Sequence, residues 1–178
     1  MLKDKILTIG ENIKIRRFAR YEVSVISYVH AGGRIGVIVN FDTSDEIASK
    51  PEFTEYAKNV AMQIAAVNPQ YLCEQEVPAS EVEKEKAILK EQIINDGKPE
   101  AIAEKIVAGR MGKFFKEICL LNQAYVKNGD LSVAQYTEET GKSLGGSITI
   151  KEFVRFEKGE GLEKRNDDFA SEVAGMIK

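Results

Sequence analysis

Two short runs of apolar and β-branched residues, Val23–Val29 and Ile35–Val39, follow each other near the start of the chain. The segment between them contains Gly32 and Gly33, which accept positive φ angles without a Cβ clash. Two β-rich runs around such a turn predict a β-hairpin. Because both runs are almost continuously apolar, we expect helices from later in the chain to cover one face of the sheet that they begin.

The segment Ile13–Glu22 alternates residue types with the period of a β-strand. Its pattern recurs near the other end of the chain in Ile148–Glu157, with identical residues at five of the ten corresponding positions. An internal repeat is the economical explanation, and it predicts that the second copy is the third strand of the sheet. The first copy has no hairpin before it in this sequence. We therefore expect Ile13–Glu22 to pair with a neighbouring copy of the chain or to detach.

A helix is predicted over residues 51–67. Ser49 is the expected N-cap, Pro51 lies at the first turn, and Asn68-Pro69 ends the helix. Its apolar residues from Phe53 to Ala65 recur at helical spacing on one face. We expect this face to cover the hairpin.

Two strongly charged helices are predicted over residues 80–115. Ser80–Glu83 has the pattern of a capping box, and Asp96–Pro99 ends the first helix and begins the second. Apolar residues form only a thin seam, which is typical of an antiparallel coiled-coil pair that projects into solvent. The expected seam residues are Val82, Leu89, Ile93, Ile102, Ile106 and Val107.

Two short helices are predicted near the end of the chain. Ser132 is the expected cap of a helix that runs from Val133 to about Thr140, and Asn166 or Asp167 caps a last helix through Phe169, Val173 and Met176. The predicted fold class is α+β in two layers. A small antiparallel sheet, made of the hairpin and the third strand, packs on helices, and an antiparallel coiled-coil helical hairpin projects from it.

Composition argues against several classes of partner. The chain has 25 basic and 28 acidic residues, a net charge of −3, and no strongly basic stretch, so we expect no direct nucleic-acid binding. No apolar run approaches the roughly 20 residues that cross a bilayer, and no signal-peptide core follows Met1. We expect a cytoplasmic protein with no membrane contact. Cys73 and Cys119 lack metal-ligand spacing and are assigned to structure.

The sequence carries no pattern typical of an active site. The glycines of Gly32-Gly33 and Gly159–Gly161 lack the spacing of phosphate-binding loops, and the carboxylates form no convergent pair. We predict no catalytic residues, no cofactor and no metal site, and no enzyme activity. His30 is the single histidine, and beside a glycine turn it is either an ordinary polar residue at the edge of the sheet or a contact to a partner.

Five segments together resemble bacterial elongation factor Ts, the nucleotide-exchange factor for elongation factor Tu. The matching segments are Ile9–Phe18, Tyr28–Val37, Gly97–Arg110, Leu120–Val126 and Arg155–Gly161. The resemblance implies two related core subdomains, in agreement with the internal repeat. It implies a remnant of the first subdomain over residues 1–22, and a second, dimerisation-type subdomain over residues 23–178 into which the coiled coil of residues 80–115 is inserted.

The resemblance also implies that the chain binds elongation factor Tu and belongs to the guanine-nucleotide exchange factors of protein synthesis. The family's N-terminal helical module and its Thr-Asp-Phe motif are not found in this sequence. We therefore expect a fragment with impaired exchange, or alternatively a docking or oligomerisation module without exchange activity. A homo-oligomer through Ile13–Glu22 is a further expectation. The expected partner-binding residues are His30, Ala31, Gly32, Gly33, Gly97, Lys98 and Pro99.

Overall fold

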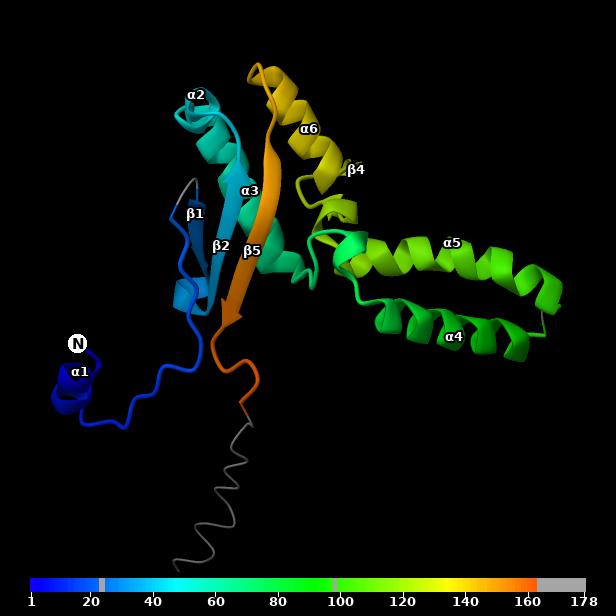
Figure 1. The fold of residues 1–178 in the computed structure, drawn as a ribbon, viewed down its shortest axis with the longest axis horizontal. Coiled ribbons are helices and arrows are strands. Elements are labelled where there is room, and N and C mark those ends of the chain that lie inside the picture. The colour runs from blue at the N-terminus through cyan, green and yellow to red at the C-terminus, as the bar shows by residue number, and fades with distance from the viewer. Residues whose placement is uncertain (23–24, 98, 163–178) are drawn as a thin grey trace, which may run out of the picture.

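The computed structural model describes residues 1–22, 25–97 and 99–162 of the chain. Figure 1 shows a small sheet with helices packed against it and a long helical pair that projects to one side. The described residues contain a three-stranded antiparallel sheet, a two-stranded ribbon and six α-helices. This α+β architecture is the one that the sequence predicts.

The central sheet contains the predicted hairpin and the predicted third strand. Strands β1 (Val25–His30) and β2 (Ile35–Asp42) pair antiparallel through the short turn η1 (Ala31–Gly33). Strand β5 (Thr149–Glu157) pairs with the other edge of β2, so the strand order is β1-β2-β5. The second copy of the internal repeat is thus a strand of the sheet, as predicted.

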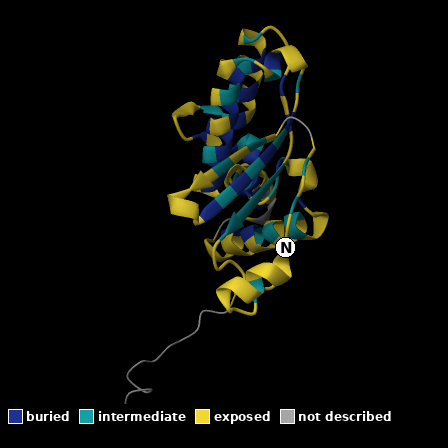
Figure 2. Cartoon of the chain, turned by 90° about the vertical axis from the view of Figure 1, so that its left-hand side faces the viewer, coloured by how far each residue is buried: buried dark blue, intermediate teal, exposed yellow. Residues whose placement is uncertain are grey.

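Helix α3 (Pro51–Val67) covers one face of the sheet, which confirms the predicted lid. Alternate residues of β2 are buried, as expected for a strand with one covered face. Figure 2 shows the buried residues concentrated between the sheet and its helices. The buried members of this core include Val37, Val39, Phe41, Phe53, Tyr56, Val60, Ile64 and Leu120.

The predicted cap of α3 is wrong. Lys50 occupies the N-cap position and makes no side-chain cap. The Ser49 hydroxyl instead donates to the carbonyl of Asp45, at the end of a short helix that the sequence did not indicate, α2 (Asp45–Ala48). Ser44 caps the start of α2. Because Ser49 lies at the end of α2 and its hydroxyl is bonded there, it does not cap α3.

The projecting pair consists of α4 (Ala79–Asn95) and α5 (Glu100–Ile118). The seam contains Leu89, Ile93 and Val107 as predicted, but Ile102 is half exposed and Ala103 is fully buried in its place. The predicted Ser80 capping box is also wrong, because the N-cap of α4 is Pro78, two residues earlier, and Ser80 lies inside the helix. Gly97, at φ 76°, turns the chain between the two helices, as predicted.

The helical pair is joined to the body through a compact root. Val77, Ile118 and Cys119 are buried there against Phe114 and Phe115. After the turn η3 (Leu120–Asn122), an unpredicted ribbon forms from β3 (Ala124–Tyr125) and β4 (Asn128–Ser132). It leads into α6 (Val133–Ser143), where Ser132 forms the predicted cap, here as a full capping box.

The N-terminal segment departs from its prediction. Helix α1 (Leu2–Ile9) ends at Gly10 as expected, but Ile13–Glu22 forms no strand in the structure. Instead Arg17 pairs with Glu160 at 2.9 Å and lies over the Phe156 ring, and Tyr21 bonds to Glu152 at 3.4 Å. Side chains, not a backbone ladder, thus hold this segment beside β5. The predicted last helix lies outside the described residues.

Candidate partner-binding site

The turn after β1 presents the predicted residues on the protein surface. His30, Ala31, Gly32 and Gly33 are all exposed, and the last three all have positive φ angles, of 49°, 63° and 94°. Ala31 adopts a conformation that costs a residue with a Cβ about 1–2 kcal/mol. We call residues 30–34 the turn rim. Three consecutive left-handed residues give it a defined shape that ordinary β-turns lack.

Arg34 joins the turn rim to Glu157 at the end of β5, and Arg155 of β5 holds the same carboxylate. Arg34 Nε donates to Glu157 Oε1 at 3.2 Å, and Arg155 Nη2 donates to Glu157 Oε2 at 2.8 Å. The bond from Arg155, followed by that from Arg34, holds the pKa of the Glu157 carboxyl below its usual range. The backbone amide of Lys158 also donates to the carbonyl of Arg34 at 2.8 Å. The turn is therefore held against the end of β5 by one side-chain bond and one backbone bond.

His30 itself is held by a tyrosine of the same strand. The Tyr28 hydroxyl lies 2.9 Å from His30 Nδ1, and the two ring centroids are 5.8 Å apart. Tyr28 packs partly into the core, whereas His30 lies beyond it. Within the part of the chain that the structure describes, the other ring nitrogen of His30 has no hydrogen-bond partner.

The second predicted group lies at the tip of the helical pair. Gly97 and Pro99 are both exposed there, and Lys98 lies outside the described residues. Ile94 and Ile102, beside the tip, are 45% and 50% exposed, which adds apolar surface that the sequence analysis did not assign to a site. Figure 1 places the tip at the far end of the projection from the turn rim. The predicted residues therefore form two separate groups.

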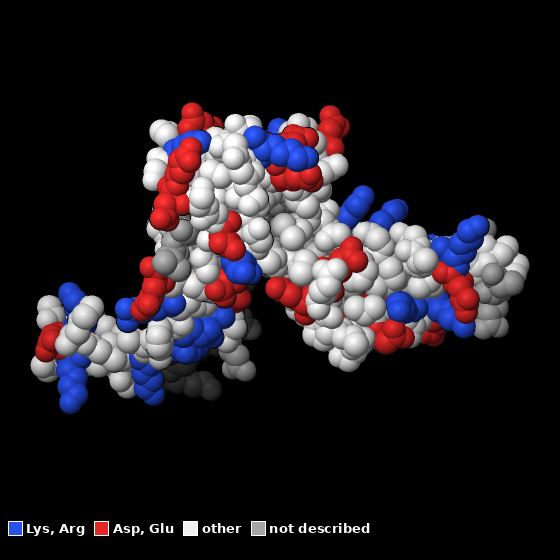
Figure 3. Space-filling view, turned by 45° about the horizontal axis from the view of Figure 1, so that its top comes forward, with Lys and Arg blue, Asp and Glu red and all other residues white. Residues whose placement is uncertain are grey.

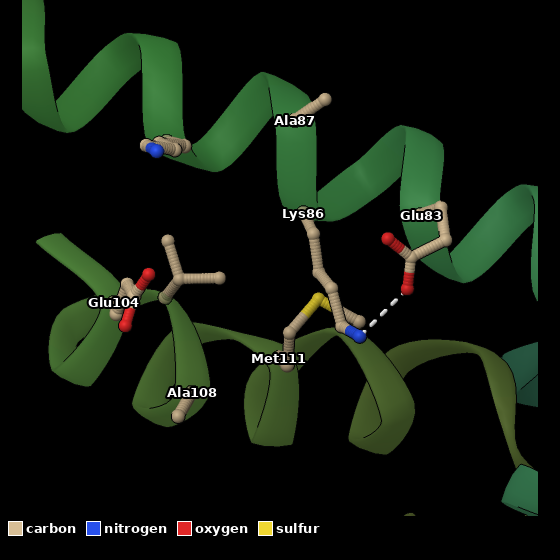
Figure 4. Close-up of a pocket in the computed structure, with 8 residues that line it drawn as sticks. Glu83, Lys86, Ala87, Glu104, Ala108 and Met111 are labelled. Atoms are coloured by element: carbon tan, nitrogen blue, oxygen red, sulfur yellow. Dashed lines mark hydrogen bonds and ion pairs between the residues drawn. The ribbon is translucent and has the colours of Figure 1, made fainter.

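A groove of about 500 Å³ runs along one side of the projection. Figure 4 shows side chains of both helices around it, with Met111 and Ala108 on α5 and the ion pair of Lys86 and Glu83 on α4. The groove is the open side of the thin seam between the helices. Nothing in its lining of alanine, methionine and charged side chains resembles a site built for one ligand.

The rest of the described chain offers little chemistry of other kinds. Among the described residues, no group of three or more His, Cys, Asp and Glu side chains is placed to hold a metal ion. Cys119 is buried, which raises its thiol pKa to about 11, and Cys73 is partly exposed; both are free. Figure 3 shows basic and acidic side chains interspersed over the face in view.

Two parts of the site were missed by sequence reasoning. Tyr28 precedes His30 by two residues on a predicted strand, and this spacing alone places their side chains on one face. The brace from Arg34 to Glu157 joins residues far apart in the sequence. The antiparallel pairing of Ile35 with Glu157 brings them together, and that pairing has no local signal.

Two exposed features therefore stand out in the described residues. They are a braced turn at one end of the sheet and the tip of a projecting helical pair. In the described residues, no helix combines the length and the apolar character needed to cross a membrane.

Comparison with known proteins identifies the family. The family model described as elongation factor TS matches residues 1–160. Elongation factor Ts of Clostridium perfringens strain ATCC 13124 is 51% identical over 99% of this chain and 58% of its own length. The corresponding proteins of Syntrophotalea carbinolica and Symbiobacterium thermophilum are 50% and 49% identical, over 98% and 97% of this chain and 58% of each relative. The chain belongs to the elongation factor Ts family, whose members are translation elongation factors.

Proposed function

We propose that this chain binds elongation factor Tu and promotes release of its bound GDP. The turn rim and the tip of the helical pair are the proposed contact surfaces. The observation that carries this proposal is the exposed His30 on a turn braced by Arg34 and Glu157, in a chain of the elongation factor Ts family. A cytoplasmic location is part of the same proposal.

An exchange factor of this kind breaks no covalent bond. It binds the GTPase more tightly without nucleotide than with it, and linkage then requires that the factor weaken nucleotide binding by the same ratio. Binding alone is therefore not enough, because a factor with equal affinity for both states shifts nothing. The sequence has no Thr-Asp-Phe motif, and we propose that exchange by this chain is impaired for that reason.

His30→Ala should weaken binding to elongation factor Tu by about tenfold, the size of effect typical of a central interface residue. The melting temperature should stay within about 2 °C of the parent, because an exposed side chain contributes little to folding. Titration calorimetry and the release rate of labelled GDP would measure the two properties. Lys142→Ala, on the exposed face of α6, is the control and should leave both unchanged.

The same two measurements separate the proposal from its rival. Binding together with faster GDP release supports an exchange factor. Binding with release at the spontaneous rate supports a docking module without exchange activity. If the parent chain does not bind elongation factor Tu, or if His30→Ala binds as well as the parent, the proposed role of the turn rim is wrong.

We also propose that the chain self-associates through Ile13–Glu22. The supporting observation is that Ile15 is 65% exposed and Phe18 is 83% exposed. Among the described residues, the amides of residues 14–22 donate no backbone hydrogen bond. An extended segment with free amides and exposed apolar side chains is able to add to a sheet edge of another copy.

The double variant Ile15→Ser/Phe18→Ser should be monomeric where the parent associates. Light scattering across a range of protein concentrations would show a rising mass for the parent and a constant mass for the variant. Val126→Ser removes a half-exposed apolar residue from the β3–β4 ribbon and serves as the control. A parent that stays monomeric at every concentration would contradict the proposed association.

A further inference from the structure

We propose that Tyr28 is a positioning residue for His30, and that it directs a protonated Nε2 of His30 toward a main-chain or side-chain acceptor on the partner. This inference rests on the proposed function of the turn rim and deepens it. It adds a residue to the site and names the chemistry of the contact, an N–H donor from the imidazole to an oxygen.

The first step of the argument is the position of the two side chains. Tyr28 and His30 are two residues apart on β1, so they lie on the same face of the strand. The residues of β2 that pair with them are Val37 and Ile35, both of which are buried. Tyr28 packs against the core beside them, while His30 lies at the end of the strand and is exposed. The tyrosine is thus a fixed support for an exposed ring.

The second step is the hydrogen bond. A neutral imidazole has one N–H donor and one acceptor nitrogen, and a hydrogen bond at one nitrogen determines the state of the other. The Tyr28 hydroxyl lies 2.9 Å from Nδ1. When this hydroxyl donates to Nδ1, the ring proton resides on Nε2. That nitrogen is the one with no partner in the described part of the chain.

The third step is the effect on binding. A free histidine side chain has two torsion angles and two neutral tautomers. If a partner binds only one of these arrangements, its apparent affinity is reduced by the fraction of molecules that have that arrangement. The bond to Tyr28 and the ring contact at a centroid distance of 5.8 Å select one arrangement before the partner arrives. Pre-organisation of this kind raises affinity without a new contact at the interface.

Tyr28→Phe removes the hydroxyl and keeps the aromatic ring in the core. We expect affinity for elongation factor Tu to fall by about threefold to tenfold, the range of one neutral hydrogen bond. The effect should disappear in a His30→Ala background, because Tyr28 acts through His30. Tyr136→Phe, which removes a hydroxyl from α6, is the matched control and should leave the affinity unchanged.

A second measurement tests the tautomer without any partner. His30 is the single histidine of the chain, so long-range proton–nitrogen NMR reports its ring unambiguously. At alkaline pH the parent should show a protonated Nε2 and an unprotonated Nδ1, and Tyr28→Phe should show a mixture of both tautomers.

The outcomes separate this inference from the proposed function. A parent with the proton on Nδ1, or a Tyr28→Phe protein with the tautomer and affinity of the parent, overturns the positioning role even if His30→Ala loses binding. If His30→Ala binds normally, the turn rim is not the contact, whatever the NMR shows. An additive loss in the double variant would mean that Tyr28 acts on the fold and not through His30.

Discussion

Replacing Gln63 with leucine should lower the free energy of unfolding by about 3 kcal/mol, because the buried Gln123 side chain and two backbone groups would each lose a hydrogen bond. Gln63 lies on α3 and has no solvent-exposed surface. Its Nε2 donates to Gln123 Oε1 at 3.2 Å and to the carbonyl of Ala124 at 3.1 Å, and its Oε1 accepts from the amide of Val126 at 2.8 Å. Leucine fills a similar volume and can form none of these bonds.

This glutamine joins separate parts of the fold through hydrogen bonds. Gln123 is itself buried and donates from Nε2 to the carbonyl of Glu117, in the last turn of α5. The amide network therefore connects α3 with the base of the projection and with the β3–β4 ribbon. A buried network of this kind stabilises one arrangement when all its members are paired, and destabilises the fold when one is removed.

Urea unfolding of parent and variant would measure the expected change, and the melting temperature should fall by roughly 6–12 °C for a chain of this size. Gln92→Leu is the matched control, because Gln92 is an exposed glutamine on α4. It should change the unfolding energy by no more than about 0.5 kcal/mol. Equal stability of Gln63→Leu and the parent would mean that the network contributes nothing to folding.

Local patterns predicted the elements whose signals are local. The apolar stripe of Phe53–Ala65 defined α3, the glycine turn defined the β1–β2 hairpin, and the serine at position 132 identified the start of α6. In each case the period or the cap lies within one segment, and tertiary contacts agree with it. The position and exposure of the turn rim followed from the same hairpin signal.

The two copies of the internal repeat show where local patterns fail. Ile148–Glu157 lies largely within β5, because β2 offers it an antiparallel partner from Ile35 to Asp42. Ile13–Glu22 has the same alternation and forms no strand. A strand needs a neighbour for its amides and carbonyls, and the pattern alone does not supply one. For the same reason, the sequence did not predict the short pairing of β3 with β4.

The seam of the helical pair gives a similar lesson on a smaller scale. The sequence places Ile102 among the seam residues, yet it is half exposed and the neighbouring Ala103 is fully buried. Helices that approach closely favour a small residue at the contact, since interaxial distance depends on the side chains there. A choice based on apolar residue type alone therefore placed the seam contact at Ile102, one position before the residue that is buried.

Removing the outer part of the projection should leave a folded body that has lost affinity for elongation factor Tu. The shortened protein would lack residues 86–112, with a short Gly/Ser linker between Glu85 and Lys113. These residues contain the buried part of the outer cluster, Leu89, Ile93, Ala103, Val107 and Met111. Val82, Phe114 and Phe115 also pack against this cluster but keep their contacts with the root, so the deletion should shift the melting temperature of the body by only a few degrees.

A longer deletion, of residues 80–115, is the informative comparison. It also removes Val82, Phe114 and Phe115, which pack against the buried root residues Val77, Ile118 and Cys119. Exposure of that root should cost roughly 3 kcal/mol or more, the transfer energy of one to two large apolar side chains. The two deletions therefore differ in stability although both remove the proposed tip contact.

Circular dichroism melting and calorimetric titration with elongation factor Tu would measure the two properties separately. The shorter deletion should unfold cooperatively and bind more weakly than the parent, because it lacks Gly97–Pro99 while the turn rim remains. Full affinity in that protein would remove the tip from the proposed interface and leave the turn rim as the contact. A molten body would show that α4 and α5 belong to the main core, so that their thin seam is not an independent folding unit.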